Sequence, residues 1–296
     1  MDIDEKMIKA FSNRVKKEYE EFVYEGINVS KIRSMVGGYS SIDLAPNIQV
    51  RKEKNVYIYS KGQTNRVIFS IHGGGFYAGD VTSIQNCNKY IANNTNIDVI
   101  SIDYTLAPTK QYPYIMYEIY DTIRENIEKY GYTTVYISGD SAGAMLALDV
   151  VLLNPNIFSY VFMYYPVIQI EKRANWSIKE YNLKEPCTYA KASIMQLKYS
   201  IDTMKKLYLP KEYDKDSMYI NLLNIKKEDF IKLPKILVVK AEYDYFNLDI
   251  DDFCNKFNIE CIEYKGMGHG FLEILGYVDS AKEVLDETIK RIKWKF

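Results

Sequence analysis

Short apolar runs recur along the chain, and the segments between them carry apolar residues three or four positions apart. The runs are rich in Val, Ile, Phe and Tyr and are bounded by turn residues, which is typical of β-strands. The spacing of the intervening segments is typical of helices that bury one face. We therefore predict strands at Val56–Ser60, Arg66–His72, Asp98–Asp103, Thr134–Ser138, Ser159–Tyr164, Lys235–Lys240 and Glu260–Tyr264. We predict helices around Ser83–Asn93, Pro113–Lys129, Ala142–Leu153, Leu248–Phe257 and Val278–Lys293.

This alternation of strand and helix favours an α/β fold in which a mainly parallel sheet is covered by helices on both faces. Right-handed crossover connections bring the carboxyl ends of parallel strands to one edge of the sheet. Ligands of such folds usually bind in the loops that follow those strand ends. Residues that follow the predicted strands are therefore the first candidates for chemistry.

Two segments interrupt the alternation. Residues 1 to about 45 begin with an amphipathic pattern, and residues 169 to about 232 are mostly helical in pattern and rich in Tyr and Trp. We interpret both as a mainly helical cap over the edge of the sheet, within a single domain of residues 1–296. The apolar positions that predict the N-terminal helix are Met7, Ala10, Phe11, Val15, Tyr19 and Phe22.

Composition and charge narrow the function classes. The 296 residues are 47% hydrophobic and 26% charged with a net charge of −1, so nothing favours binding to nucleic acid or to an anionic membrane. The N-terminus lacks the apolar core of a secretory signal, and the longest nearly apolar run, residues 160–168, is too short to span a bilayer. We therefore expect a cytoplasmic protein. The four cysteines form no C-x-x-C pair, so we expect reduced thiols, no metal site and no cofactor.

A candidate nucleophile stands between a predicted strand and a predicted helix. The segment GDSAG, residues 139–143, matches the G-x-S-x-G pattern, in which a sharp turn exposes the serine hydroxyl. Glycines on both sides relieve the crowding that such a turn creates. The helix that follows directs its first N–H groups toward a reacting carbonyl. Ser141 is therefore the predicted nucleophile.

A run of glycines follows an earlier predicted strand, in the segment His72-Gly73-Gly74-Gly75-Phe76. Glycines let the backbone approach a ligand closely with its N–H groups exposed, which acyl transfer needs for the negatively charged tetrahedral intermediate. We expect the N–H groups of Gly74, Gly75 and Ala142 to form this oxyanion hole, with His72 and Gly73 supporting the loop. A phosphate-binding loop does not fit, because no Gly-Lys-Ser/Thr follows and the spacing is not G-x-G-x-x-G.

The general base and its acidic partner are sought near the end of the chain. The sequence contains two histidines, and His269 lies in the glycine-rich segment GMGHGF that follows a predicted strand. We predict His269 as the base that takes the serine proton. The acid should follow the preceding strand, where Asp244 ends the segment KILVVKAEYD. Glu242 and Asp249 are the alternatives for this role.

Together these motifs resemble those of the hormone-sensitive-lipase-like family of α/β hydrolases, the HGGG esterases. The resemblance rests on HGGGFYAGD, DYTLAP, GDSAG and the pair KLPKILVVKAEYD and GMGHGF. It implies an eight-stranded, mostly parallel sheet, a cap built from the N-terminal region and an insertion, and a triad of Ser141, Asp244 and His269. The family's usual Asp-Pro-Leu is replaced here by Asp244-Tyr245-Phe246, which weakens any transfer of substrate preference.

The predicted function is a serine carboxylesterase that hydrolyses small esters, with acyl groups from acetyl to butyryl in a compact apolar pocket. An N-formyl amide hydrolase such as kynurenine formamidase is an alternative, because the same groups cleave activated amides. A non-catalytic small-molecule binding protein is a further alternative, which the presence of His269 disfavours. We expect a small ester as the binding partner, and a homodimer is compatible with the resemblance.

Overall fold

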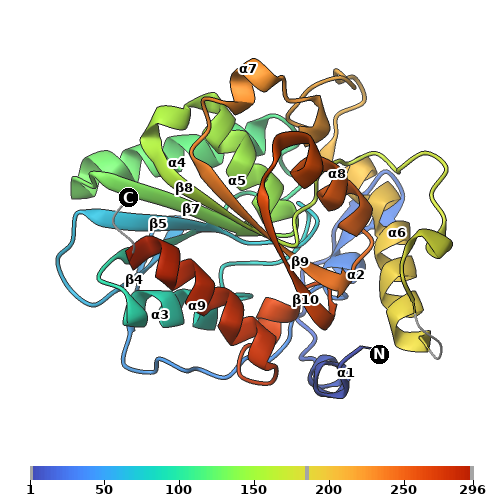
Figure 1. Ribbon diagram of the computed structural model, residues 1–296, viewed down its shortest axis with the longest axis horizontal. Coiled ribbons are helices and arrows are strands. Elements are labelled where there is room, and N and C mark those ends of the chain that lie inside the picture. Colours follow the sequence, from blue (N-terminus) through green and yellow to red (C-terminus); the bar gives the residue numbers. More distant parts are fainter. Residues whose placement is uncertain (1–2, 184–186, 294–296) are drawn as a thin grey trace.

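The computed structural model describes residues 3–183 and 187–293, and its centre is an eight-stranded sheet with the strand order β10-β9-β8-β7-β5-β6-β4-β3 (Figure 1). The strands from β10 to β6 run parallel, and β4 and β3 continue the sheet in antiparallel pairs. The predicted mostly parallel sheet of eight strands is confirmed. Its strands are β3 (Gln49–Glu53), β4 (Val56–Ser60), β5 (Arg66–Ile71), β6 (Asp98–Ile102), β7 (Thr134–Asp140), β8 (Phe158–Tyr164), β9 (Lys235–Tyr243) and β10 (Glu260–Gly268).

All seven predicted strands are present, and the sequence pattern missed the edge strand β3. Its sequence QVRKE is polar, and its side chains are mostly exposed because only one neighbour, β4, covers it. A small separate hairpin of β1 (Val23–Tyr24) and β2 (Ile27–Asn28) was also not predicted. Both elements are strands through backbone pairing alone, so they leave no apolar alternation for a sequence pattern to detect.

Helices cover both faces of the sheet (Figure 1). On one face α3 and α9 pack together, and on the other α4 packs on α5 while α8 packs on β9. Strand β5 serves both cores, since Val67, Phe69 and Ile71 belong to one apolar cluster and Ile68 to the other. The longer helices are α3 (Gln85–Asn94), α4 (Tyr114–Tyr130), α5 (Ala142–Leu153), α6 (Thr188–Tyr208), α8 (Asn247–Phe257) and α9 (Asp279–Lys293).

The N-terminal helix is shorter than predicted. Helix α1 (Glu5–Ser12) ends well before Tyr19 and Phe22, and residues 14–22 have no regular structure. Long-range contacts account for the early end. The Val15 N–H donates to the Gly38 carbonyl at 2.8 Å, and the Arg14 guanidinium donates to the carbonyls of Gly37 and Ser34. These partners hold the chain away from the helical path, and Val15 is left 63% exposed.

The segment 169–232 contains one long helix, α6, between irregular stretches. It also holds η2 (Ile178–Glu180), η3 (Leu222–Asn224) and α7 (Lys227–Phe230), while α2 (Val29–Arg33) lies in the N-terminal region. Figure 1 shows α1 and α6 near the same end of the sheet. Residues 184–186 of this segment, and residues 1–2 of the N-terminal one, lie outside the described residues.

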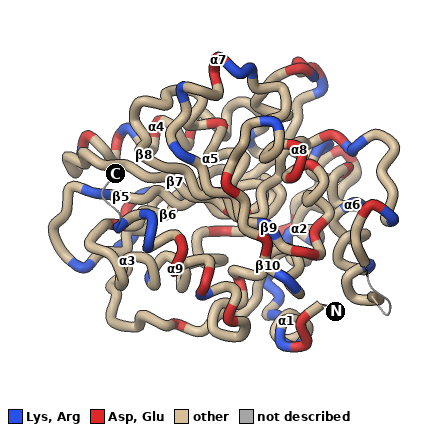
Figure 2. Tube along the Cα trace, in the orientation of Figure 1, with Lys and Arg blue, Asp and Glu red and all other residues tan. Residues whose placement is uncertain are grey.

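Positively and negatively charged residues are mixed along the chain. Figure 2 shows lysine and arginine interspersed with aspartate and glutamate along the whole trace, in keeping with the net charge of −1. Within residues 3–183 and 187–293, no helix is both long enough and apolar enough to cross a bilayer.

Candidate active site

Ser141 stands on a sharp turn between β7 and α5. Its backbone has φ 55° and ψ −123°, a left-handed conformation that non-glycine residues rarely adopt. Two backbone hydrogen bonds hold the turn: the Ser141 N–H donates to the Tyr164 carbonyl at 2.9 Å, and the Val167 N–H donates to the Ser141 carbonyl at 3.1 Å. A side chain at Gly143 would come within 3.0 Å of the Ile71 carbonyl oxygen, so only glycine fits there. The sharp turn that the motif predicts at Ser141 is present.

The three residues predicted as a triad lie in one row of hydrogen bonds. His269 Nε2 lies 2.7 Å from Ser141 Oγ, and His269 Nδ1 lies 2.6 Å from Asp244 Oδ2. The histidine ring packs against the rings of Tyr165 and Phe246, with centroids 5.0 and 5.4 Å away. These contacts fix the ring plane between the hydroxyl and the carboxylate, which is the geometry that proton transfer from the serine requires.

Asp244 is completely buried and is oriented by its own loop. Its Oδ1 accepts the N–H of Phe246 at 3.0 Å, which leaves Oδ2 for the histidine. The two alternatives point elsewhere. Glu242 belongs to β9 and accepts the Gly266 N–H at 2.7 Å, while Asp249 belongs to α8 and pairs with Gln169 and Arg173. Of the three candidate acids, the structure brings only Asp244 to the histidine.

The glycine loop after β5 lies against Ser141. Gly74 and Gly75 have φ values of +115° and +63° and line the same cavity as Ser141, while Ala142 is the first residue of α5. Within the described residues, the N–H groups of Gly74, Gly75 and Ala142 have no hydrogen-bond partner. A side chain at Gly74 would come within 3.0 Å of the Ala78 carbonyl oxygen. Three unpaired donors beside a serine hydroxyl can stabilise a developing oxyanion.

His72 and Gly73 make contacts that hold this loop in place. The His72 ring is fully buried, stacks on Tyr104 at 4.3 Å between centroids, and places Nδ1 2.8 Å from the Gly73 carbonyl oxygen. Burial lowers the pKa of His72, so the ring stays neutral. The Tyr104 hydroxyl donates to the His72 carbonyl at 2.9 Å. These contacts agree with the supporting position expected for His72, and they make Tyr104 part of the scaffold of the loop.

Asp140 is a site residue that the sequence analysis did not single out. Its Oδ1 accepts the Gly73 N–H at 2.9 Å, which ties the nucleophile turn to the glycine loop. Burial raises the pKa of Asp140 to about 6, while the hydrogen bond from Gly73 and the charge of His269 oppose the rise. The signal was available in the motif, since an acidic residue occupies the position directly before the serine.

A cavity of about 650 Å³ opens above Ser141 and His269. Its walls come from α1 and α6, so both segments predicted as a cap contribute side chains to it. The cavity is larger than an acetyl or butyryl group needs, and its lining is not uniformly apolar. Hydroxyl and amide side chains of α6 line one wall, and Glu273 of η4 (Phe271–Ile274) reaches the same space.

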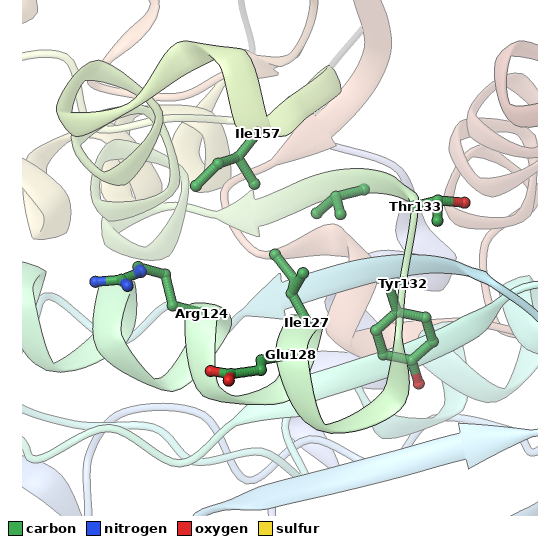
Figure 3. Close-up of a pocket in the computed structure, with 7 residues that line it drawn as sticks. Arg124, Ile127, Glu128, Tyr132, Thr133 and Ile157 are labelled. Carbon is green, nitrogen blue, oxygen red and sulfur yellow. The ribbon is translucent and has the colours of Figure 1, made fainter.

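A second depression lies at the opposite end of the sheet (Figure 3). It has a volume of about 380 Å³ and is bordered by the end of α4 and by Thr133 and Ile157, which directly precede β7 and β8. Its lining residues include no serine, cysteine or histidine. In the described part of the chain no cluster of three or more His, Cys, Asp or Glu side chains is arranged to hold a metal ion, and the four cysteines are free thiols.

Comparison with known protein families adds a relationship that covers most of the chain. The family model for the alpha/beta hydrolase fold matches residues 68–273, which include Ser141, Asp244 and His269. An α/β hydrolase of Acanthamoeba polyphaga mimivirus is 25% identical over 291 residues, which are 90% of this chain and 80% of the viral protein.

Two esterases are similar over a shorter stretch. An arylesterase of Saccharolobus solfataricus is 28% identical over 200 residues, 65% of this chain and 62% of the arylesterase. An acetyl esterase of Salmonella schwarzengrund is 26% identical over 206 residues, 63% of this chain and 58% of the acetyl esterase. The chain therefore spans about three fifths of the length of these two enzymes.

Solved structures extend the likeness to the whole fold. Carboxyl esterase 2 of the fungus Tuber melanosporum has a TM-score of 0.74 at 21% identity and covers 98% of both chains. A thermophilic carboxylesterase from a metagenomic library has a TM-score of 0.67 at 22% identity, over 80% of this chain and 83% of that enzyme. At these identities the likeness shows that the architecture is shared.

Proposed function

The chain belongs to the hormone-sensitive-lipase-like family of α/β hydrolases, and on this premise we propose that it is a serine carboxylesterase whose acyl-enzyme forms on Ser141. The observation that carries the proposal is the row of hydrogen bonds from Asp244 through His269 to Ser141. The arylesterase and acetyl esterase relatives support ester hydrolysis as the reaction.

The proposed reaction is a two-step acyl transfer. Ser141 Oγ attacks the ester carbonyl carbon as its proton passes to His269 Nε2, and Asp244 stabilises the charged imidazole. The N–H groups of Gly74, Gly75 and Ala142 hold the negative charge that develops on the former carbonyl oxygen. His269 then gives the proton to the leaving alcohol. A water molecule repeats the sequence on the acyl-enzyme and releases the acid.

For the acyl part of the substrate we propose a short chain, from acetyl to butyryl. The acetyl esterase relative supports this choice. We also propose that residues 1 to about 45 and 169 to about 232 act as the cap of a single domain, because side chains from both segments line the cavity above the serine. A cap of this kind excludes water from the reacting carbonyl and positions the substrate.

The proposal is tested first by removing the nucleophile. We expect Ser141→Ala to lower turnover of p-nitrophenyl acetate by on the order of 10⁶-fold, and to abolish covalent labelling by a fluorophosphonate probe. Ser280→Ala, a matched serine change in α9 outside the cavity, should leave both readouts unchanged. Full turnover or full labelling in Ser141→Ala would contradict the assignment.

The substrate class is tested separately with a panel of p-nitrophenyl esters from acetate to decanoate, together with N-formylkynurenine. We expect kcat/KM to be highest for acetyl to butyryl chains. Highest activity on chains near ten carbons contradicts the short-chain proposal, and preferential cleavage of N-formylkynurenine indicates an amide hydrolase instead. If the protein binds one of these compounds specifically but forms no covalent adduct on Ser141, it is a binding protein rather than an enzyme.

A further inference from the structure

The cavity above the triad has two chemically different walls. Helix α1 lines it mainly with apolar side chains, whereas α6 adds hydroxyl and amide groups three or four positions apart, on one side of the helix, beside the apolar Ala192, Leu197 and Met204. The apolar wall consists of Met7, Ile8 and Phe11 of α1 together with Ile3, which precedes the helix. The polar wall consists of Ser193, Gln196, Ser200 and Thr203.

Glu273 adds a carboxyl group to this cavity. It lies four residues after His269, in η4, and lines the cavity together with Ser141 and Asp140. Its Oε2 is buried and has no hydrogen-bond partner among residues 3–183 and 187–293. Gly37 lies directly against this carboxyl, since a Cβ atom there would stand about 3.4 Å from Oε2. Glu273 therefore presents an unused hydrogen-bonding group to whatever occupies the cavity.

An unpaired buried polar atom is costly, and the cost falls when a ligand supplies the missing partner. Leaving a buried acceptor unsatisfied costs about 1–3 kcal/mol. A site that hydrogen-bonds a substrate hydroxyl rejects the analogue without it, because the site's own polar group then stays unpaired. A purely apolar ester would leave Glu273 Oε2 without a partner, whereas the hydroxyls of Ser193 and Ser200 already donate to the carbonyls of Tyr243 and Leu197.

We propose, on the basis of the esterase function above, that the cavity holds the alcohol part of the ester, that this part carries several hydroxyl groups as in an acylated sugar or polyol, and that Glu273 hydrogen-bonds to one of them. The volume supports this placement, since about 650 Å³ far exceeds the needs of an acetyl or butyryl group and lies within the range of cavities that hold larger ligands. Glu273 acts as a specificity-determining residue and takes no part in the acyl transfer.

The raised pKa of Glu273 makes it a neutral hydrogen-bonding group rather than a negative charge. Burial and repulsion from Asp140 raise the pKa of Glu273 to about 8, and the opposite charges of Arg14 and Lys17 do not cancel the rise. At neutral pH the group is mostly a protonated carboxylic acid, which can both donate to and accept from a hydroxyl.

The test compares two acetate esters of matched shape. In 6-O-acetylglucose and cyclohexylmethyl acetate, a primary acetate is attached to a six-membered ring, and only the sugar carries hydroxyls. We expect the wild type to have at least tenfold higher kcat/KM for the sugar ester. Glu273→Leu should reduce this preference about tenfold, the order of one lost hydrogen bond. Glu273→Gln should restore most of it, because the amide also donates and accepts.

Glu228→Leu is the matched control, since Glu228 is exposed on α7 and lies outside the cavity. In this variant the ratio of kcat/KM for 6-O-acetylglucose to kcat/KM for cyclohexylmethyl acetate should equal that of the wild type. A wild type that favours cyclohexylmethyl acetate, or a preference that is the same in Glu273→Leu, overturns the proposal. Faster cleavage of acetylcholine than of the sugar ester also overturns it, because it would identify a cationic alcohol as the preferred occupant.

A binding measurement separates this proposal from the esterase function. We expect Ser141→Ala to bind 6-O-acetylglucose in calorimetry, and the added change Glu273→Leu to raise Kd about tenfold. If the wild type cleaves no ester and takes no fluorophosphonate, yet this rise in Kd is observed, the esterase function fails and the Glu273 contact stands. If p-nitrophenyl acetate is cleaved but Kd does not depend on Glu273, the esterase function stands and the contact is refuted.

Discussion

Glu273 makes the stability of this protein depend on pH in a predictable direction. The pKa of its buried carboxyl is raised from the ordinary 4.5 to about 8, mainly by burial and then by the nearby Asp140. The folded state therefore keeps a proton that the unfolded chain releases between these two pH values. Because the unfolded state binds fewer protons in this window, the free energy of unfolding decreases as the pH rises from about 4.5 to about 8. At higher pH, ionisation of Glu273 causes no further decrease in the free energy of unfolding.

The size of the effect follows from the same two values. A difference of one pKa unit between folded and unfolded states corresponds to about 1.4 kcal/mol, so Glu273 accounts for a loss of ~4–5 kcal/mol across the window. Asp140 contributes in the same direction with a smaller range, since its pKa is raised from 3.8 to about 6. Arg14 and Lys17 act against the rise at Glu273, and the pKa of about 8 already includes their effect.

The assay is urea unfolding at 25 °C, followed by circular dichroism at a series of pH values from 5 to 9. Glu273→Gln keeps the shape of the side chain but cannot ionise, so its advantage over the wild type should grow by ~4 kcal/mol between pH 5 and pH 9. Glu228→Gln, a change at an exposed position, should follow the wild type at every pH. An advantage of Glu273→Gln that is the same at pH 5 and pH 9 would refute this account of the buried carboxyl.

Three further changes probe the site and the core. Asp244→Asn should lower kcat for p-nitrophenyl acetate by about 10⁴-fold because the histidine loses its orienting carboxylate, whereas an unchanged kcat would indicate that Glu242 takes over. Gly74→Ala should lower kcat by about 10²–10³-fold, because the added methyl group meets the Ala78 carbonyl and displaces the oxyanion loop; a loss confined to KM contradicts this role. Both carboxylate oxygens of Asp149 are buried without a hydrogen-bond partner in the described residues, and burial raises its pKa well above the usual range. Asp149→Asn should therefore gain stability over the wild type as the pH rises in urea unfolding, and a gain that shrinks with pH would contradict the direction of this shift.

The sequence predicted the elements whose position depends on local pattern. The seven strands with apolar alternation or apolar runs were all found, because burial on a sheet leaves a period that can be read in the residues themselves. The turn that carries Ser141 was predicted for a related reason, since a strand, a turn flanked by glycines and a helix leave few other arrangements for it. His269 was singled out because the sequence contains only one other histidine.

The errors arose where contacts distant in sequence decide the outcome. The pattern that predicted a helix through Phe22 is real, but the chain beyond Ser12 is held by Gly38, Gly37 and Ser34, which no local pattern contains. Asp140 was passed over because a carboxyl next to a serine has no role until the glycine loop is folded against it. In both cases the partner lies 20 or more residues away in the sequence.

Helix α6 shows why the substrate could not be derived in the same way. Its apolar stripe, with Ile194, Ile201 and Met204 buried, predicts which side packs on the protein. The polar side of such a helix usually faces water, and the sequence of the helix alone does not show when it faces a cavity instead. That side is part of the cavity wall here only because α1, more than 170 residues earlier in the chain, lies across from it over Ser141. Whether Ser193 and its neighbours meet water or substrate is therefore a property of the assembled fold, and the proposal of a hydroxylated alcohol could be made only after the two helices were seen to enclose one space.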